Sequence, residues 1–130
     1  MTAETNLSIL LSSMNPVLHP DTFVFATLSE SERKKRNLQP ILEFREEEGV
    51  TIIIKQSEAA PIGLKTQYPC RMITLNVHSN LNAVGFLARI STALAEKGIS
   101  VNVVSAFYHD HLFVPVDRAE EAMGVLRSQA

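Results

Sequence analysis

The chain has 130 residues, of which 45% are hydrophobic and 20% are charged. This composition supports one ordinary buried core or two small units that share it, and it excludes a disordered chain. The formal net charge is -2 and the charges are dispersed, so binding of nucleic acid through its phosphates is not expected. The single cysteine, Cys70, can form neither an internal disulfide nor a cysteine-based metal motif.

Export and membrane insertion are not expected either. Residues 7–11 are apolar, but Glu4 precedes them without any lysine or arginine, and Ser12 and Ser13 follow directly. This pattern argues against a signal peptide. The sequence also lacks a run of about 20 apolar residues that would span a bilayer. We therefore expect a cytoplasmic protein with no membrane partner.

The first half of the chain is expected to open with a helix. Apolar residues recur with helical spacing in residues 5–14, and an Asn-Pro pair ends the pattern. Residues 19–21 have the chemistry of a turn, and the aromatic and β-branched residues of 22–28 predict a strand. Residues 29–39 are polar and include a basic run at 33–36, which predicts a solvated loop.

A hairpin and a linker complete the first half. Residues 41–45 and 50–56 predict two strands, and Gly49 between them can take the positive φ that a hairpin needs. Residues 57–68 predict one helical turn followed by a linker, with a boundary at residues 68–69. No strand is predicted before the opening helix, so this half lacks the strand that would begin a regular unit.

The second half predicts strand, helix, strand, strand and helix. The strands are expected at residues 72–77, 100–107 and 111–116, and the first helix at residues 83–97. The last two strands are joined by a short turn and should pair antiparallel. Asp117 is expected to cap the final helix.

This order predicts an α+β fold of the ferredoxin-like kind, with an antiparallel sheet and helices on one face. Such a sheet normally has a fourth strand, and without it the strand at residues 72–77 would have an unpaired edge. We therefore expect two incomplete halves, residues 1–69 and 70–130, that complete each other. The hypothesis is that residues 22–28 supply the missing neighbour, within the chain or from a second subunit.

The loop before the first helix of the second half is the expected binding site. Free N–H groups and the positive end of a helix dipole favour a carboxylate, and amide side chains can hydrogen-bond an α-amino acid. The alternative is structural, with an asparagine that only caps the helix and a glycine that only eases packing. The candidate ligand-binding residues are Ser79, Asn80, Leu81, Asn82, Ala83, Val84, Gly85 and Phe86, together with Ser105 on the second strand.

The histidines form a second conspicuous set. On an extended segment, His109 and His111 would place two imidazoles on one side, about 6 to 7 Å apart, and His78 is a possible third metal ligand. A contact in a pocket or an interface and an exposed turn are the alternatives, and no metal or cofactor is expected. No serine, cysteine or carboxylate stands in a catalytic motif with these histidines, so no enzyme is predicted.

Several segments resemble a known family. The order of apolar strand, N-L-N-A-V-G-F-L (residues 80–87), helix, G-I-S-V (residues 98–101), strand, hairpin and helix resembles the ACT domain, a regulatory module of amino-acid metabolism. In the first half, V-L-H-P-D-T-F-V-F (residues 17–25) and F-R-E-E-E-G-V-T (residues 44–51) resemble tandem ACT-like proteins of bacteria. Those proteins are mostly uncharacterised and are similar to the paired ACT modules of cytosolic arginine sensors.

The resemblance implies two ACT-like halves and, commonly, a homodimer. It implies a regulatory or sensor protein that binds an amino acid at an interface and acts on a partner enzyme. Asn82 stands where many members carry aspartate, Gly85 matches the characteristic glycine, and Val84 replaces the usual proline. The alternative is a protein-interaction or oligomerisation module that binds no small ligand.

Overall fold

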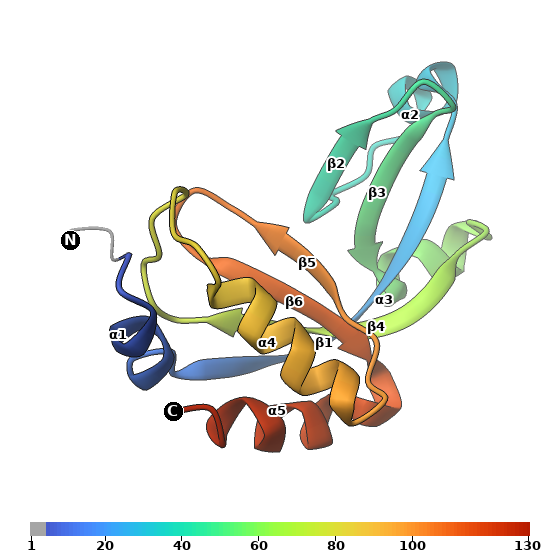
Figure 1. Cartoon of the computed structure of the whole chain (residues 1–130). Helices are drawn as coiled ribbons and strands as arrows, with labels where there is room; N and C mark the ends of the chain where they lie inside the picture. The colour runs from blue at the N-terminus through green and yellow to red at the C-terminus, as the bar shows by residue number, and fades with distance from the viewer. Residues whose placement is uncertain (1–4) are drawn as a thin grey trace. The chain divides into compact units, whose positions relative to one another are not determined.

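The computed structural model describes residues 5–130, which form an α+β fold with an antiparallel six-stranded sheet (Figure 1). The strands are hydrogen-bonded in the order β2-β3-β1-β4-β6-β5. The chain divides into two compact units, which are Met1–Pro20 with Arg71–Ala130 (unit 1) and Asp21–Cys70 (unit 2). Within residues 5–130, every helix is too short or too polar to cross a membrane. Glu4, which entered the argument against a signal peptide, lies outside the described residues.

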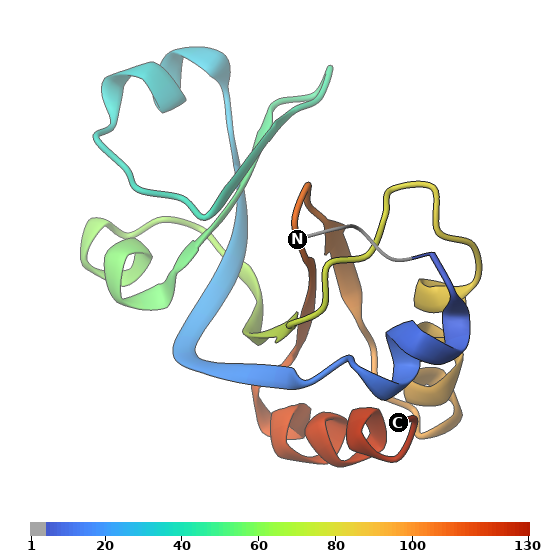
Figure 2. The ribbon, with the colours of Figure 1, turned by 90° about the vertical axis from the view of Figure 1, so that its left-hand side faces the viewer.

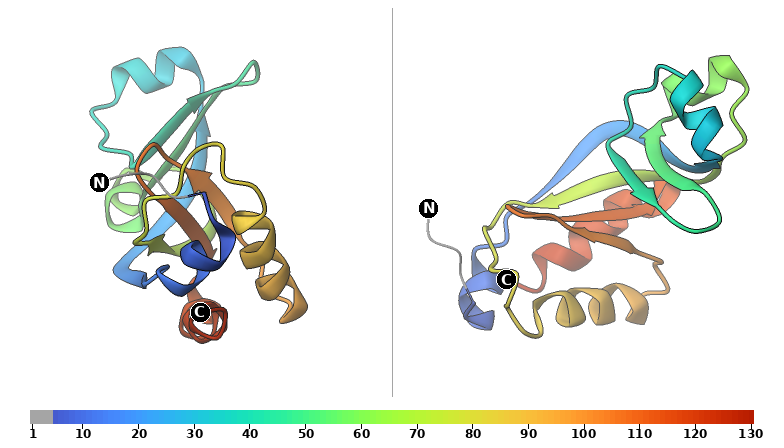
Figure 3. Two further views of the ribbon diagram at one scale, coloured as in Figure 1. Left: turned by 60° about the vertical axis from the view of Figure 1, so that its left-hand side comes forward. Right: turned by 90° about the horizontal axis from the view of Figure 1, so that it is seen from above.

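Unit 1 has the ferredoxin-like layout that the second half of the sequence predicts. Its helices lie on one face of its strands, which the right-hand view of Figure 3 shows most clearly. Their apolar sides form one core with the inward residues of the strands, such as Ile73, Leu75, Leu112 and Val114. Its elements are α1 (Leu7–Ser12), the start of β1 (Pro16–Leu28), the end of β4 (Gln67–Leu75), α4 (Phe86–Glu96), β5 (Asn102–Ser105), β6 (Asp110–Pro115), a 3-10 turn (Val116–Arg118) and α5 (Ala119–Arg127).

The free edge of β4 is paired within the same chain. β1 lies beside β4, and in unit 1 the Asn76 N–H donates to the Asn15 carbonyl at 3.4 Å while Arg71 Nε donates to the His19 carbonyl at 3.0 Å. The start of β1 thus fills the position for which residues 22–28 were expected. Figure 2 shows this part of β1 running on from α1.

The turn predicted at residues 19–21 is wrong, because these residues lie inside β1. Pro20 has no backbone N–H, and a proline is tolerated in a strand only where that missing donor is not needed. The pairing of β1 with β3 begins only at Phe23, so the proline precedes the doubly paired part of the strand. The pairing of the other edge of β1 with β4 therefore outweighs the local preference of these residues for a turn.

Both predicted helix starts in the second half are also wrong. α4 begins at Phe86 instead of residue 83, because its N-cap Gly85 has φ +91° and α-helical geometry cannot continue upstream through such a residue. The Asn80 side chain accepts a hydrogen bond from the Asn82 N–H and caps no helix. Asp117 lies in the 3-10 turn, so α5 starts after Arg118 without a side-chain cap.

Unit 2 contains the predicted hairpin and a helix that was not predicted. β2 (Leu42–Arg45) and β3 (Val50–Lys55) pair antiparallel, and β3 also pairs with the later part of β1. The expected loop contains α2 (Glu30–Lys35), and the Ser29 hydroxyl accepts from the Glu32 N–H at its start. Acidic residues in its first turn and basic residues in its last turn suit the helix dipole, so the basic run belongs to a short exposed helix. The predicted helical turn is α3 (Gln56–Ala59), which continues as a 3-10 turn (Ala60–Ile62).

Cys70 is fully buried in unit 2, where its thiol donates to the Phe23 carbonyl at 3.4 Å. Burial raises the pKa of this thiol to about 12. Because a thiol reacts as its thiolate, Cys70 is inert at neutral pH. It is a small core residue.

The packing of α1 generates a test of unit 1. Leu10 is fully buried, whereas its neighbour Ile9 is 48% exposed. We expect Leu10→Ala to lower the free energy of unfolding by about 2 to 5 kcal/mol, because it removes core packing and leaves a cavity. Urea denaturation followed by circular dichroism measures this change.

Ile9→Ala is the matched control, and its effect should stay within about 0.5 kcal/mol. Equal effects of the two substitutions would contradict the placement of α1 as a structural part of unit 1.

Candidate functional site

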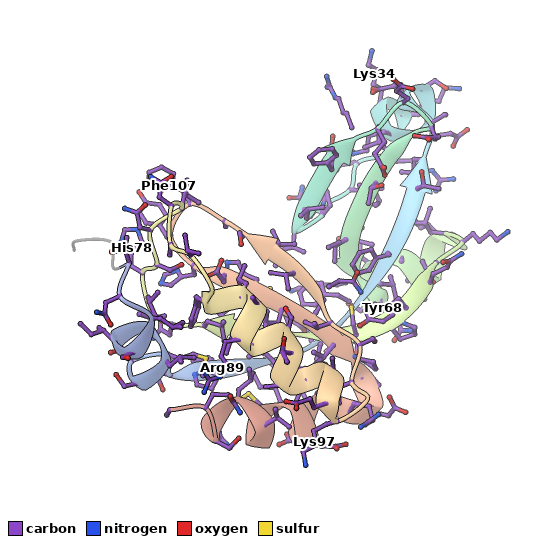
Figure 4. The ribbon with its side chains drawn as sticks, in the orientation of Figure 1. Lys34, Tyr68, His78, Arg89, Lys97 and Phe107 are labelled. Atoms are coloured by element: carbon purple, nitrogen blue, oxygen red, sulfur yellow. The ribbon has the colours of Figure 1, made fainter. Side chains whose placement is uncertain are left out.

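A small cavity lies in unit 1 where the β4–α4 loop meets the β5–β6 hairpin. Figure 4 shows the labelled residues His78 and Phe107, one from each of these loops, at the same end of the unit. The cavity has a volume of about 140 Å³. Since a water molecule takes up about 30 Å³ in the liquid, the cavity holds a few waters or one small metabolite. Its lining residues are Ser79, Asn80, Leu81, Ala83, Gly85, Phe86, Leu87, Ala88, Ser105 and Asp110.

Most of the sequence candidates meet at this cavity. Seven of the nine line it, and they include Ser105 from β5 as well as the loop residues. The other two do not: Asn82 lines a neighbouring hollow of about 260 Å³ together with His78 and Phe107, and Val84 is 84% exposed and lines neither. The structure thus brings the loop and the facing strand together, and their role in binding a ligand stays a prediction.

The N-terminal turn of α4 forms one wall of the cavity. Gly85, Phe86, Leu87 and Ala88 all line it, and the first backbone hydrogen bond of the helix runs from the Arg89 N–H to the Gly85 carbonyl at 3.0 Å. The N–H groups of the first helical residues have no partner within a helix, and they carry the positive end of its dipole. This wall can therefore receive an anion.

The residues that line the cavity also include a carboxylate that the sequence did not single out as a site residue. Asp110 is only 5% exposed, and among the described residues it is the one charged side chain in the buried class. Its Oδ2 accepts a hydrogen bond from the Ser79 hydroxyl at 2.8 Å, which ties the loop to the start of β6. The available signal was its register, because Asp110 shares the inward face of β6 with Leu112 and Val114, and a charge is rare there.

A hydrogen-bonded chain crosses three neighbouring strands of unit 1. His19 Nε2 lies 2.8 Å from Thr74 Oγ1, which lies 3.0 Å from His111 Nδ1. Burial and then the nearby His109 lower the pKa of His111, and they outweigh Asp110, which raises it. His111 is therefore neutral at pH 7 and does not balance the charge of Asp110.

The histidine pair has the predicted spacing but does not extend to a metal site. The rings of His109 and His111 lie 6.4 Å apart between centroids, while His78 lies against Tyr108, with ring centroids 5.8 Å apart. Among residues 5–130, no group of three or more histidine, cysteine or acidic side chains is placed to hold a metal ion.

The antiparallel strands of unit 1 and the helices on one face of them define a ferredoxin-like α+β module. Residues 2–71 match one model of the ACT domain, and residues 67–128 match a second one. The chain therefore belongs to the ACT-domain family, with two ACT domains in tandem. Among curated proteins, none matches the chain.

Several solved structures are similar to this chain. A protein of unknown function from Vibrio cholerae, described as a possible transport protein, is 41% identical over 95% of both chains, with a TM-score of 0.84. A protein from Agrobacterium tumefaciens is 19% identical over 88% of this chain and 87% of its own, with a TM-score of 0.71. The ligand-free regulatory subunit of aspartate kinase from Thermus thermophilus is 10% identical over 91% and 98%, with a TM-score of 0.69. For the last two proteins, the sequence identity is so low that the similarity shows only a shared fold.

The lowered pKa of His111 predicts a pH dependence of stability. Because the folded chain holds the His111 pKa below its usual value of 6.5, the unfolded chain takes up this proton more readily as the pH falls below about 6.5. The contribution of His111 to stability is therefore complete above pH 6.5 and is lost as the pH falls toward its folded pKa. We expect His111→Asn to reduce the loss of Tm between pH 7 and pH 5.5, measured by differential scanning fluorimetry.

Asparagine keeps a polar atom in the place of Nδ1 for Thr74, so the hydrogen-bonded chain is preserved. If the wild type and His111→Asn show the same dependence of Tm on pH, His111 does not cause it.

Proposed function

We propose that this protein is a non-enzymatic regulatory or sensor protein of the cytoplasm that binds an amino acid or similar small molecule. The proposed site is the cavity in unit 1 between the β4–α4 loop and the β5–β6 hairpin. The observation that supports it is the N-terminal turn of α4, whose residues line a small cavity together with Ser105 of β5. The first N–H groups of a helix have no partner within it and favour an anion, and the serine hydroxyl can also donate. These groups suit the carboxylate of an amino acid.

The ACT family adds support, because its domains commonly bind amino acids and are typically non-catalytic. One of the similar structures is a regulatory subunit of aspartate kinase, an enzyme regulated through that subunit. For the present chain we propose the same general use of the fold, with binding coupled to a partner enzyme or to a homodimer. In this proposal Asn80 hydrogen-bonds the ligand, and the other loop residues that line the cavity shape the site. Asn82 and Val84 do not line this cavity and have no part in the proposed site.

The alternative function is a protein-interaction or oligomerisation module without a small ligand. The observation in its favour is a group of exposed apolar side chains on the same two loops. Leu81 and Phe107 are each 67% exposed, Tyr108 is 64% exposed, and the rings of Phe107 and Tyr108 lie 5.0 Å apart between centroids. Exposed apolar clusters mark binding surfaces in many proteins.

A thermal-shift screen against the standard amino acids tests the proposed function. A ligand present at 100 times its Kd stabilises the native state by about 2.7 kcal/mol, which is several degrees of Tm for a chain of this size. We expect at least one amino acid to give such a shift. If none of them raises Tm, amino-acid binding by this protein is refuted.

Two substitutions in α4 test where the ligand binds. Ala88 and Ala95 are both exposed residues of this helix, but only Ala88 lines the cavity. We expect Ala88→Leu to fill the cavity and abolish the Tm shift, while Ala95→Leu keeps it. A shift that survives Ala88→Leu would place the ligand elsewhere.

The alternative function makes its own prediction. If the exposed aromatic loop residues mediate self-association, Phe107→Ser should raise the dissociation constant of the dimer by roughly 30-fold, as expected for an interface hot spot. Phe44→Ser is the control, because Phe44 is 65% exposed but lies on β2 in unit 2. Analytical ultracentrifugation over a concentration series measures both, and equal constants for wild type and Phe107→Ser would rule out this surface.

A further inference from the structure

The charge of Asp110 is poorly compensated within the protein. Asp110 is only 5% exposed, and the one hydrogen bond of its carboxylate among the described side chains comes from the neutral hydroxyl of Ser79 at 2.8 Å. None of the ion pairs formed between described residues includes Asp110. A buried charge normally has a cationic partner, because its loss of hydration is unfavourable without one.

The adjacent His111 does not supply that partner. His111 adjoins Asp110 in the chain, but burial and His109 keep its pKa below the usual range, so its imidazole is neutral at pH 7. Asp110 reaches the cavity that the N-terminal turn of α4 also lines. The residues that line the cavity therefore include both a carboxylate that can accept a cation and the first turn of a helix, whose N–H groups can donate to an anion.

We propose that Asp110 binds the ammonium group of the ligand, so that this cavity selects a small zwitterionic α-amino acid over the 2-hydroxy acid with the same side chain. This inference rests on the proposed function and specifies the ligand class of that same site. A volume of about 140 Å³ allows one small molecule to contact both walls at once. The carboxylate of the amino acid then meets the N–H groups of Phe86 to Ala88, and its ammonium group meets Asp110.

The size of the cavity further restricts which amino acids can bind. Glycine, alanine and serine place their charged groups within a few bonds of each other and add few other atoms. A larger side chain would have to leave through the exposed rim, to which Leu81 and Ser105 belong. The expected ligands are therefore amino acids with small side chains.

The test compares matched pairs of ligands on the full-length protein. Isothermal titration calorimetry with glycine and glycolate, L-alanine and L-lactate, and L-serine and L-glycerate measures the effect of replacing ammonium by hydroxyl. In the wild type, we expect the amino acid of at least one pair to bind roughly 10- to 150-fold more tightly than its hydroxy acid, the range for a hydrogen bond to a charged group. Equal affinities within every pair that binds would overturn the role of Asp110 and leave the proposed function standing.

Two variants separate the charge of Asp110 from its link to the loop. Asp110→Asn removes the charge but keeps an oxygen that can accept from Ser79, so we expect the preference for the amino acid to disappear. Ser79→Ala removes the link but keeps the charge, so the preference should remain. The reverse result, with the preference kept in Asp110→Asn and lost in Ser79→Ala, would make Asp110 only a structural tie.

Other outcomes are equally decisive. Melting curves of both variants show whether they fold. If Asp110→Asn does not fold, the pairs of ligands on the wild type and the Ser79→Ala variant still test the proposal.

Binding of larger amino acids alone would refute the small zwitterionic ligand and keep the proposed function, whereas no amino acid binding at all would refute both. Tm shifts with CaCl₂ that require Asp110, without any such amino acid effect, would show that the carboxylate is a cation site instead.

Discussion

Unit 1 depends on the hydrogen bonding of both edges of β4. β6 lies along one edge, and the start of β1 lies along the other, although β1 comes from the opposite end of the sequence. An unpaired central edge would leave backbone donors and acceptors unsatisfied beside the core. The early strand therefore completes the sheet, and α1 before it adds Leu10 and Leu11 to the same core.

The candidate site follows from this arrangement. With β4 held between β1 and β6, the loop after β4 is carried over the end of the sheet toward the first residue of β6. The hydrogen bond between Ser79 and Asp110 joins the two at that point. Gly85 then turns the chain into α4, and its positive φ ends the loop and sets the first N–H groups of the helix against the cavity. The hydrogen bond between Ser79 and Asp110 and the positive φ of Gly85 thus position the residues that line the cavity.

The site also departs from the rules that hold elsewhere in the molecule. The inward positions of β6 are apolar except for its first residue, and among the described residues this aspartate is the only buried charge. A charge at such a position lowers stability unless a cation or several donors compensate it. Buried charges without a compensating partner are found mainly at binding sites, where a ligand can provide the compensating charge.

The sequence by itself determined the order of the elements other than α2, the hairpins, the inward faces of the helices and the loop that carries most of the cavity, because these follow from local periodicity and turn chemistry. Tertiary structure decided what local patterns could not. Pro20 lies in a strand because a distant segment pairs with its other edge, and α4 starts at Phe86 because Gly85 before it adopts a positive φ. Asp110 belongs to the site because the register of β6 points it inward against Ser79, a contact across 31 positions of sequence that no local pattern encodes.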